Sequence, residues 1–227
     1  MEHLRKYVER IPFADAALRR VGIGGFSTSA DYWERRYRKG GNSGAGSYRN
    51  LAEFKARVVN DFVSRNRIQT VIEHGCGDGA QLQLAKYPRY TGVDVSSTAI
   101  ELCRRAFAGD FMKRFILAQD LNDDTEAELA LSLDVIYHLV EDDVLKDICV
   151  NVFNSASRFV IMYSSNMDSS WPSRHVRHRE FTRWVEENEA GWSLLSTVKN
   201  IYPYDPERED ETSFADFYIF GKSEGPL

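Results

Sequence analysis

A short apolar run that leads into closely spaced glycines constrains the fold of this chain more than any other feature. Residues 70–73 read Thr-Val-Ile-Glu, and Gly75, Gly77 and Gly79 follow at alternate positions. The apolar run predicts a buried strand, and the glycines allow a sharp turn whose bare backbone a ligand can approach closely. A strand that enters such a turn is typical of nucleotide-binding units, in which the helix after the turn presents its free N–H groups.

The glycine spacing also separates this turn from the dinucleotide fingerprint G-x-G-x-x-G. Here the pattern is G-x-G-x-G, and the acid Glu73 stands before the first glycine. These differences disfavour an NAD-linked oxidoreductase. An ordinary tight turn stays open as an alternative for the three glycines.

Strand-like and helix-like segments alternate along most of the chain. Short apolar runs predict strands at residues 70–73, 90–94, 115–118, 129–133, 159–163, 197–202 and 214–220. Helical periodicity predicts helices at residues 51–65, 80–85, 97–107, 144–156 and 181–189. The alternation predicts an α/β fold with one doubly wound sheet of about seven strands, mainly parallel with an antiparallel last strand.

The first 50 residues have a different character. Residues 2–20 carry apolar positions at helical spacing with an interruption at Pro12, which predicts a short helical N-terminal extension. An aromatic and basic segment at 31–37 precedes a glycine-serine loop at 40–47. We therefore divide the chain into an N-terminal helical segment with a glycine-rich loop, 1–50, and a main domain, 51–227.

Further acids follow the next two predicted strands. Asp94 ends the strand after the glycine turn, where its carboxylate can accept hydrogen bonds from both hydroxyls of a ribose. With residues 71–79 as motif I, Asp94 as the ribose acid, Asp120 as the acid near the adenine and residues 132–139 as motif IV, the chain resembles the class I methyltransferase family. The resemblance covers about residues 68–165. It implies a Rossmann-like fold and S-adenosylmethionine (SAM) as cofactor.

The cofactor site follows from the matched motifs and from the N-terminal segment. Several families of this class place an aromatic and basic segment over the cofactor, and a glycine-serine loop suits a lid that opens and closes at each turnover. The alternative for the loop is a solvated linker. We expect these residues to bind the cofactor: Tyr32, Arg36, Ser43, Gly44, Glu73, Gly75, Cys76, Gly77, Asp94, Val95, Ser96, Asp120, Leu121, Ser132 and Leu133.

Histidines supply the candidate bases for the acceptor. A hydroxyl acceptor needs a base or a metal ion to remove its proton, whereas the enzyme otherwise mainly positions the nucleophile. His138 follows the fourth strand and is our first choice, with a structural histidine as the alternative. His175 and His178 lie in a basic stretch, 171–180, whose arginines can bind carboxylate, phosphate or hydroxyl groups unless the stretch is simply solvated.

A divalent cation is a second way to activate a hydroxyl. Asp134 lies just past the fourth strand, and with His138, Glu141, Asp142 or one of the later histidines it could hold Mg²⁺ or another divalent cation. Cys76 has no base marked beside it in the sequence, so we expect it to pack rather than to act as a nucleophile.

Composition narrows the partners and the compartment. A net charge of −5 argues against a broad surface for nucleic acid, and no apolar stretch is long enough for a membrane span. Three widely spaced cysteines match no zinc pattern, and a reduced, cytoplasmic setting is the simplest expectation.

We therefore expect a SAM-dependent O-methyltransferase that modifies a small molecule. The segments 33–47 and 175–179 resemble those of small bacterial sugar and polysaccharide methyltransferases, which implies a saccharide acceptor. Two alternatives stay open: an N-methyltransferase of a metabolite or protein, and a non-catalytic SAM-binding protein that acts through a partner. A homo-oligomer is also open.

Overall fold

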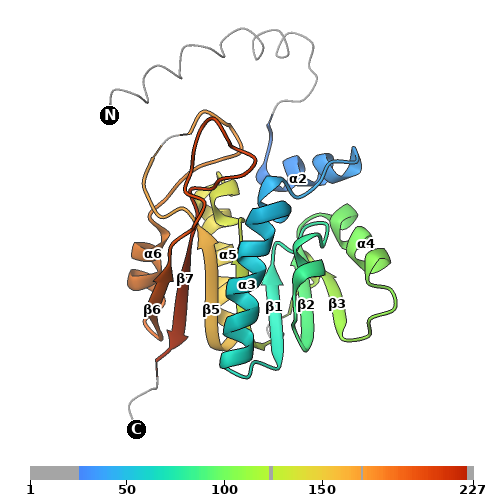
Figure 1. Cartoon of the computed structure of the whole chain (residues 1–227), viewed down its shortest axis with the longest axis vertical. Coiled ribbons are helices and arrows are strands. Elements are labelled where there is room, and N and C mark those ends of the chain that lie inside the picture. The colour runs from blue at the N-terminus through green and yellow to red at the C-terminus, as the bar shows by residue number, and fades with distance from the viewer. Residues whose placement is uncertain (1–25, 123–124, 170, 224–227) are drawn as a thin grey trace, which may run out of the picture.

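The structure is a computed structural model, and it describes residues 26–122, 125–169 and 171–223 (Figure 1). The N-terminal helix expected at 2–20 lies outside these residues. Within the described ranges, none of the helices has the length and apolar character that crossing a bilayer requires.

The described residues form a sheet of seven strands in the order β3-β2-β1-β4-β5-β7-β6. The strands are β1 (Thr70–His74), β2 (Arg89–Asp94), β3 (Lys113–Leu117), β4 (Ala127–Leu133), β5 (Ala156–Ser164), β6 (Trp192–Val198) and β7 (Asp216–Lys222). Strands β1 to β5 pair in parallel, and β7 is antiparallel to both β5 and β6. The predicted doubly wound sheet with an antiparallel last strand is confirmed.

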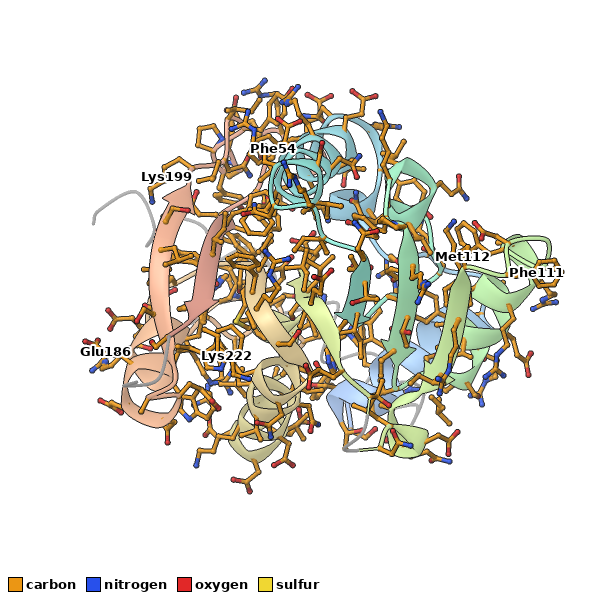
Figure 2. The ribbon with its side chains drawn as sticks, turned by 90° about the horizontal axis from the view of Figure 1, so that it is seen from below. Phe54, Phe111, Met112, Glu186, Lys199 and Lys222 are labelled. Atoms are coloured by element: carbon orange, nitrogen blue, oxygen red, sulfur yellow. The ribbon has the colours of Figure 1, made fainter. Side chains whose placement is uncertain are left out.

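Helices cover both faces of the sheet. They are α2 (Ser29–Arg38), α3 (Arg49–Arg65), α4 (Ser97–Ala106), α5 (Asp142–Asn154) and α6 (Phe181–Asn188). Phe54 of α3 and Ile100 of α4 belong to one buried cluster, and Val152 of α5 and Phe181 of α6 belong to the other. Figure 2 shows the two layers from below, with Phe54 and Glu186 on opposite sides of the sheet. Helix α2 instead lies beyond the carboxyl ends of the parallel strands (Figure 1).

The helix predicted at 80–85 is wrong. Only one 3-10 turn, η3 (Gln81–Leu84), follows the glycine turn. Asn60 of α3 accepts from the Lys86 backbone N–H and donates to the Leu84 carbonyl, so a side chain takes backbone groups that a longer helix would use. Pro88 then disfavours helical geometry in the residue before it. The glycine turn therefore lacks the long helix dipole expected behind it.

The strand predicted at 197–202 is displaced. Strand β6 begins at Trp192 and ends at Val198. A register shift between Leu194 and Ser196 interrupts its pairing with β7, and the serines and leucines there do not alternate strictly. A bulge of this kind breaks the two-residue period that marks a strand in a sequence.

Candidate cofactor pocket and active site

A pocket lies at the carboxyl ends of β1, β2 and β4, beneath α2. Its volume is about 1050 Å³, counting the space at its open mouth. Ligands of doubly wound sheets bind at this edge because the loops there diverge where the strand order reverses. The expected location of the site is therefore matched by a real cavity.

The glycine turn forms the floor of the pocket. Gly75, Gly77 and Gly79 all have positive φ angles, of 86°, 56° and 79°. A Cβ atom on Gly77 would stand 2.3 Å from the Ser43 hydroxyl oxygen, so no other residue fits here without displacing the loop above it.

Asp94 lies beside this turn and lines the pocket. Its Oδ2 accepts from the Gly77 N–H at 2.9 Å, and its Oδ1 accepts from the Ser96 N–H at 2.9 Å. Burial raises the pKa of Asp94 to about 6. Each carboxylate oxygen keeps a further lone pair, so the group can still accept bonds from two ligand hydroxyls.

One part of the pocket lining is apolar. Its lining here comes from the loops after β2, β3 and β4 and from helix α5: Val95, Ala118, Leu121, Val135, Val144 and Ile148. Such a lining suits a flat, weakly polar ring, whose burial releases water from apolar surface.

Another part of the pocket carries buried charge. The ammonium of Lys55, on α3, is 2.5 Å from Oδ2 of Asp134, and the Lys55 side chain is only 1% exposed. Tyr137 donates its hydroxyl to Oδ1 of the same carboxylate at 2.8 Å. Asp134 has a positive φ of 62°, which is rare for a residue with a side chain and is found at functional sites.

Gln81 adds an unsatisfied acceptor to this charged end. Its Nε2 donates to the Ala52 carbonyl, but its Oε1 is buried and has no hydrogen-bond partner among the described residues. Buried carbonyl oxygens without a partner are costly, so this atom marks a place for a ligand donor.

Glu73 is the most buried acid of the pocket wall. Tyr90 donates its hydroxyl to Glu73 at 2.5 Å, and burial raises the pKa of this carboxyl group to about 7. The neighbouring His74 bonds to Ser155 on the far side of the sheet, and burial lowers its pKa to about 4. His74 therefore has a structural role.

The N-terminal segment closes the pocket from above. Glu34 of α2 accepts bonds from Ser96 and Thr98 at the start of α4. Asp78 in the glycine turn accepts bonds from the N–H and hydroxyl of Ser43 and from the hydroxyl of Tyr48. The glycine-serine loop is thus fixed to the turn instead of being a solvated linker.

His138 is the histidine of the predicted bases that lines the pocket. Its Nδ1 donates to the His175 carbonyl at 3.1 Å, which leaves the lone pair on Nε2. Its ring meets Trp33 edge to face at 5.0 Å. Burial lowers the pKa of His138 to about 4, so the imidazole is neutral at neutral pH.

The other two histidines lie outside this pocket. The His175 ring stacks on Tyr32 at 4.4 Å and on the His138 ring at 5.5 Å, and the His175 carbonyl accepts from His138. His178 is buried and its Nδ1 shares a hydrogen bond with Ser165 at 2.7 Å. Of the three predicted bases, the structure therefore brings only His138 to the cofactor pocket.

The pocket separates the predicted cofactor residues into two groups. Those that line it are Ser43, Glu73, Gly75, Cys76, Gly77, Asp94, Val95, Leu121 and Leu133. Those outside its lining are Tyr32, Arg36, Gly44, Ser96, Asp120 and Ser132. Arg36 packs over Trp33 and donates to the Asn42 carbonyl. It therefore connects helix α2 to the loop above the pocket and does not line the pocket itself.

Lys55 and Gln81 are functional candidates that the sequence interpretation missed. Lys55 had a visible signal, because it stands on the apolar stripe of its helix between Leu51 and Val59, one turn from each. A charge on a buried stripe is rare and calls for a partner. Gln81 lies in the 3-10 turn, and nothing local in the sequence marks it.

The carboxylates of the predicted cation site are already engaged by other protein groups. Asp134 is held by Lys55 and Tyr137, Glu141 accepts two bonds from Ser29, and Asp142 pairs with two arginines. Across 26–122, 125–169 and 171–223, no group of three metal-ligating side chains occurs. The residues proposed for Mg²⁺ thus do not converge on a common point.

Comparison with known proteins adds a family and a fold. Residues 72–161 match the family model of the methyltransferase domain. A search of curated proteins finds no match.

Solved structures share the fold. The N-methyltransferase NodS from Bradyrhizobium japonicum WM9, in complex with S-adenosyl-L-homocysteine, has a TM-score of 0.64 at 16% identity, covering 87% of this chain and 100% of that chain. The magnesium protoporphyrin IX methyltransferase from Synechocystis PCC 6803, with bound SAM, has a TM-score of 0.55 at 17% identity, covering 98% and 96%. The methyltransferase domain of the bacterial protein CtHen1-C has a TM-score of 0.60 at 21% identity, covering 77% and 100%. Residues 72–161 therefore match a methyltransferase domain model, and the described residues share the Rossmann-like fold of these solved structures.

Proposed function

We propose that this domain uses SAM as its cofactor and transfers the methyl group to a hydroxyl of a small molecule, a sugar or oligosaccharide. The observation that carries the cofactor assignment is the combination of chemistry within one pocket. Apolar lining, a paired carboxylate and a buried charged pair occur together there, and SAM has an aromatic base, a ribose diol and a zwitterionic amino acid to match.

Each part of the pocket matches one part of the cofactor. The apolar part beside Val95 and Leu121 would hold the adenine, and Asp94 would accept bonds from the ribose hydroxyls. At the charged end, Lys55 would bind the carboxylate of the methionine, while Gln81 Oε1 would accept from its ammonium. Charge-assisted bonds in a buried site are stronger than neutral ones, so this end would contribute much of the affinity.

The N-terminal segment would act as the lid of this site. Trp33 and Tyr37 line the pocket from above, and Ser43 is fixed to the glycine turn through Asp78. These contacts must break for a ligand of this size to enter or leave, because helix α2 covers the site.

His138 would serve as the general base. When bound, SAM supplies a methyl group on a positively charged sulfur, which departs as S-adenosylhomocysteine. The Nε2 lone pair of His138 would take the proton of the acceptor hydroxyl as its oxygen bonds to the methyl carbon. The bond from Nδ1 to the His175 carbonyl fixes the ring in the tautomer that this step needs.

The charge balance near His138 favours a hydroxyl over an ammonium as the reacting group of the acceptor. An ammonium acceptor would be held best by an unpaired carboxylate, but Asp134 is already paired with Lys55 at 2.5 Å. A hydroxyl needs no such counter-ion and gains a positioned base. This relation supports an oxygen acceptor over an amine.

The proposal is tested by binding first and by transfer second. Calorimetry with S-adenosylhomocysteine should show a single site per chain, and absence of binding would reject the cofactor. Purified protein with methyl-labelled SAM is then offered matched hydroxylated and aminated saccharides. Label on the amine alone would favour an N-methyltransferase, and tight binding without transfer to any acceptor would favour a non-catalytic SAM-binding protein.

A further inference from the structure

A second hollow lies behind the segment that orients His138. It is lined by residues 168–169, 171, 173–174 and 176–179 together with Val140, and we call it the Arg177 hollow. It is separate from the cofactor pocket, since the two share no lining residue.

An unsatisfied nitrogen lies in the wall of the Arg177 hollow. His178 is 2% exposed, and its Nε2 is buried without a hydrogen-bond partner among the described residues. Its Nδ1 lies 2.7 Å from the Ser165 hydroxyl, and when that hydroxyl donates, Nε2 carries the ring N–H. Trp171 and Phe214 pack edge to face against the ring and hold it in place.

Arg177 has donors to spare beside this histidine. Its Nη1 donates to the Val140 carbonyl at 3.0 Å and to Asp142 at 3.2 Å, whereas Nε and Nη2 have no partner in the part of the chain described. Arg179 differs, because its three nitrogens all bond to Asp142 or to the carbonyls of Leu139 and Val140. Arg179 is thus a brace, and Arg177 is the arginine that can still bind a ligand.

The acid in the wall does not oppose an anion strongly. Asp168 accepts from Arg183 and from the Glu180 N–H, so its charge is already engaged. Arg174 adds a second guanidinium to the lining. An arginine fork next to a buried N–H donor matches the geometry of a carboxylate or a phosphate.

The hollow lies next to the active site, and hydrogen bonds to backbone carbonyls connect their walls. The Arg177 N–H donates to the Tyr137 carbonyl at 2.8 Å, and the His175 carbonyl accepts from His138. The rings of His138 and His178 lie 4.4 and 6.3 Å from the Tyr137 ring, between centroids. One aromatic side chain therefore separates the general base from the unsatisfied nitrogen.

We propose that the Arg177 hollow binds the oxyanion of an acidic acceptor, a carboxylate or phosphate on a hydroxylated molecule, through Arg177 and His178 Nε2. This inference rests on the proposed function, because it names the acceptor class of the same active site. It makes the enzyme selective for acidic saccharides over neutral ones.

The test measures the NMR signal of His178 while inorganic phosphate, D-glucuronate or neutral D-glucose is added. In protein labelled with ¹⁵N-histidine, phosphate or glucuronate should move the His178 Nε2 resonance along a saturable curve, and glucose should not. Whichever of phosphate and glucuronate binds with the higher affinity indicates whether the hollow prefers a phosphate or a carboxylate. Absence of a His178 response to both anions would overturn the proposal.

Matched variants test whether Arg177 binds the anion together with His178. Arg177→Gln should weaken the anion about tenfold, and Arg177→Lys should fall between it and the parent. Arg105→Gln, a change on the exposed face of α4, should leave anion affinity unchanged. Equal losses in Arg177→Gln and Arg105→Gln would contradict the assignment.

Calorimetry with S-adenosylhomocysteine on the same samples verifies the fold of each variant. It also separates the two claims, because cofactor binding without an anion response rejects only the hollow.

Discussion

The ammonium of Lys55 and the carboxylate of Asp134 lie 2.5 Å apart in the wall of the cofactor pocket, with the lysine side chain almost wholly buried. A buried pair of this kind contributes little net stability, because desolvation offsets the attraction between the charges. Its presence beside an unpartnered Gln81 oxygen is explained better by ligand recognition than by folding.

Lys55→Met should weaken binding of the amino acid part of the cofactor and leave binding of the nucleoside part unchanged. Affinity for S-adenosylhomocysteine should fall about tenfold or more because a charge-assisted bond to its carboxylate is lost. Affinity for 5′-methylthioadenosine, which lacks the amino acid, should not change. Calorimetry with both ligands measures this, and equal losses for the two would remove Lys55 from the proposed role.

The same substitution predicts a loss of stability. Lys55→Met leaves Asp134 buried without its counter-ion, which should cost about 3 kcal/mol in free energy of unfolding. The double variant Lys55→Met/Asp134→Asn should recover most of that loss. Urea unfolding of the three proteins checks the expectation, and a double variant no more stable than the single one would contradict it.

Protonation of Asp94 and protonation of His138 should appear in different measurements. Because burial raises the pKa of Asp94 to about 6, cofactor affinity should decline as the pH falls through 6 and the ribose acceptor is lost. His138, with a pKa of about 4, should keep turnover at saturating cofactor nearly constant down to pH 5. A pH profile of kcat and kcat/KM tests both, and a fall of kcat near pH 6.5 would indicate another base.

Glu73 should make the fold less stable at high pH. Its pKa rises from 4.5 in the unfolded chain to about 7 in the folded one, so its stabilising contribution is complete below pH 4.5 and is lost as the pH rises through 7. Glu73→Gln removes this dependence. Its unfolding free energy relative to the parent should increase by about 3 kcal/mol between pH 4 and pH 8, and a pH-independent difference would contradict the linkage.

His138→Gln should lower turnover by about 10²-fold or more and leave S-adenosylhomocysteine affinity nearly intact. His175→Ala is the matched comparison, since it retains the carbonyl that accepts from His138 and should have a much smaller effect. Rates from single-turnover assays distinguish the two. Similar losses in both variants would indicate that the His175 side chain has a direct part in the reaction.

Gly77→Ala should disturb the cover of the site. The new methyl group would stand 2.3 Å from the Ser43 hydroxyl oxygen at a positive φ, so the loop must move away and cofactor affinity should fall. Gly109→Ala meets open space at an ordinary φ and is the control. Partial recovery of affinity in Gly77→Ala/Ser43→Gly would trace the loss to the Ser43 clash, because the Tyr37 hydroxyl oxygen, 2.8 Å from the new methyl group, is still in place.

The sequence predicted the sheet well because hydrophobic periodicity reports burial locally. The strand ending in the glycine turn and the acid Asp94 lie where their patterns indicated, since both depend on short-range backbone geometry. The helix at 80–85 failed because Asn60, far away in the sequence, takes its backbone groups. Long-range side-chain contacts of that kind leave no periodic signal.

In the site, too, features set by the local sequence were predicted better than features that depend on distant segments. Cys76, Val95 and Leu121 lie in the loops after β1, β2 and β3, and their side chains line the pocket. Lys55 reaches the pocket from a helix that precedes the matched motifs, and His175 acts through its carbonyl, which residue type cannot indicate. Residue identity therefore predicted the nucleoside end of the pocket better than the end where the chemistry occurs.

Ser96 connects two processes that are usually considered separately. Its N–H holds Asp94, while its hydroxyl donates to Glu34 on helix α2. Release of the helix would free that hydroxyl and remove a restraint one residue from the ribose acid. Release of S-adenosylhomocysteine and opening of helix α2 would then be coupled, because Ser96 contacts both Asp94 and the helix.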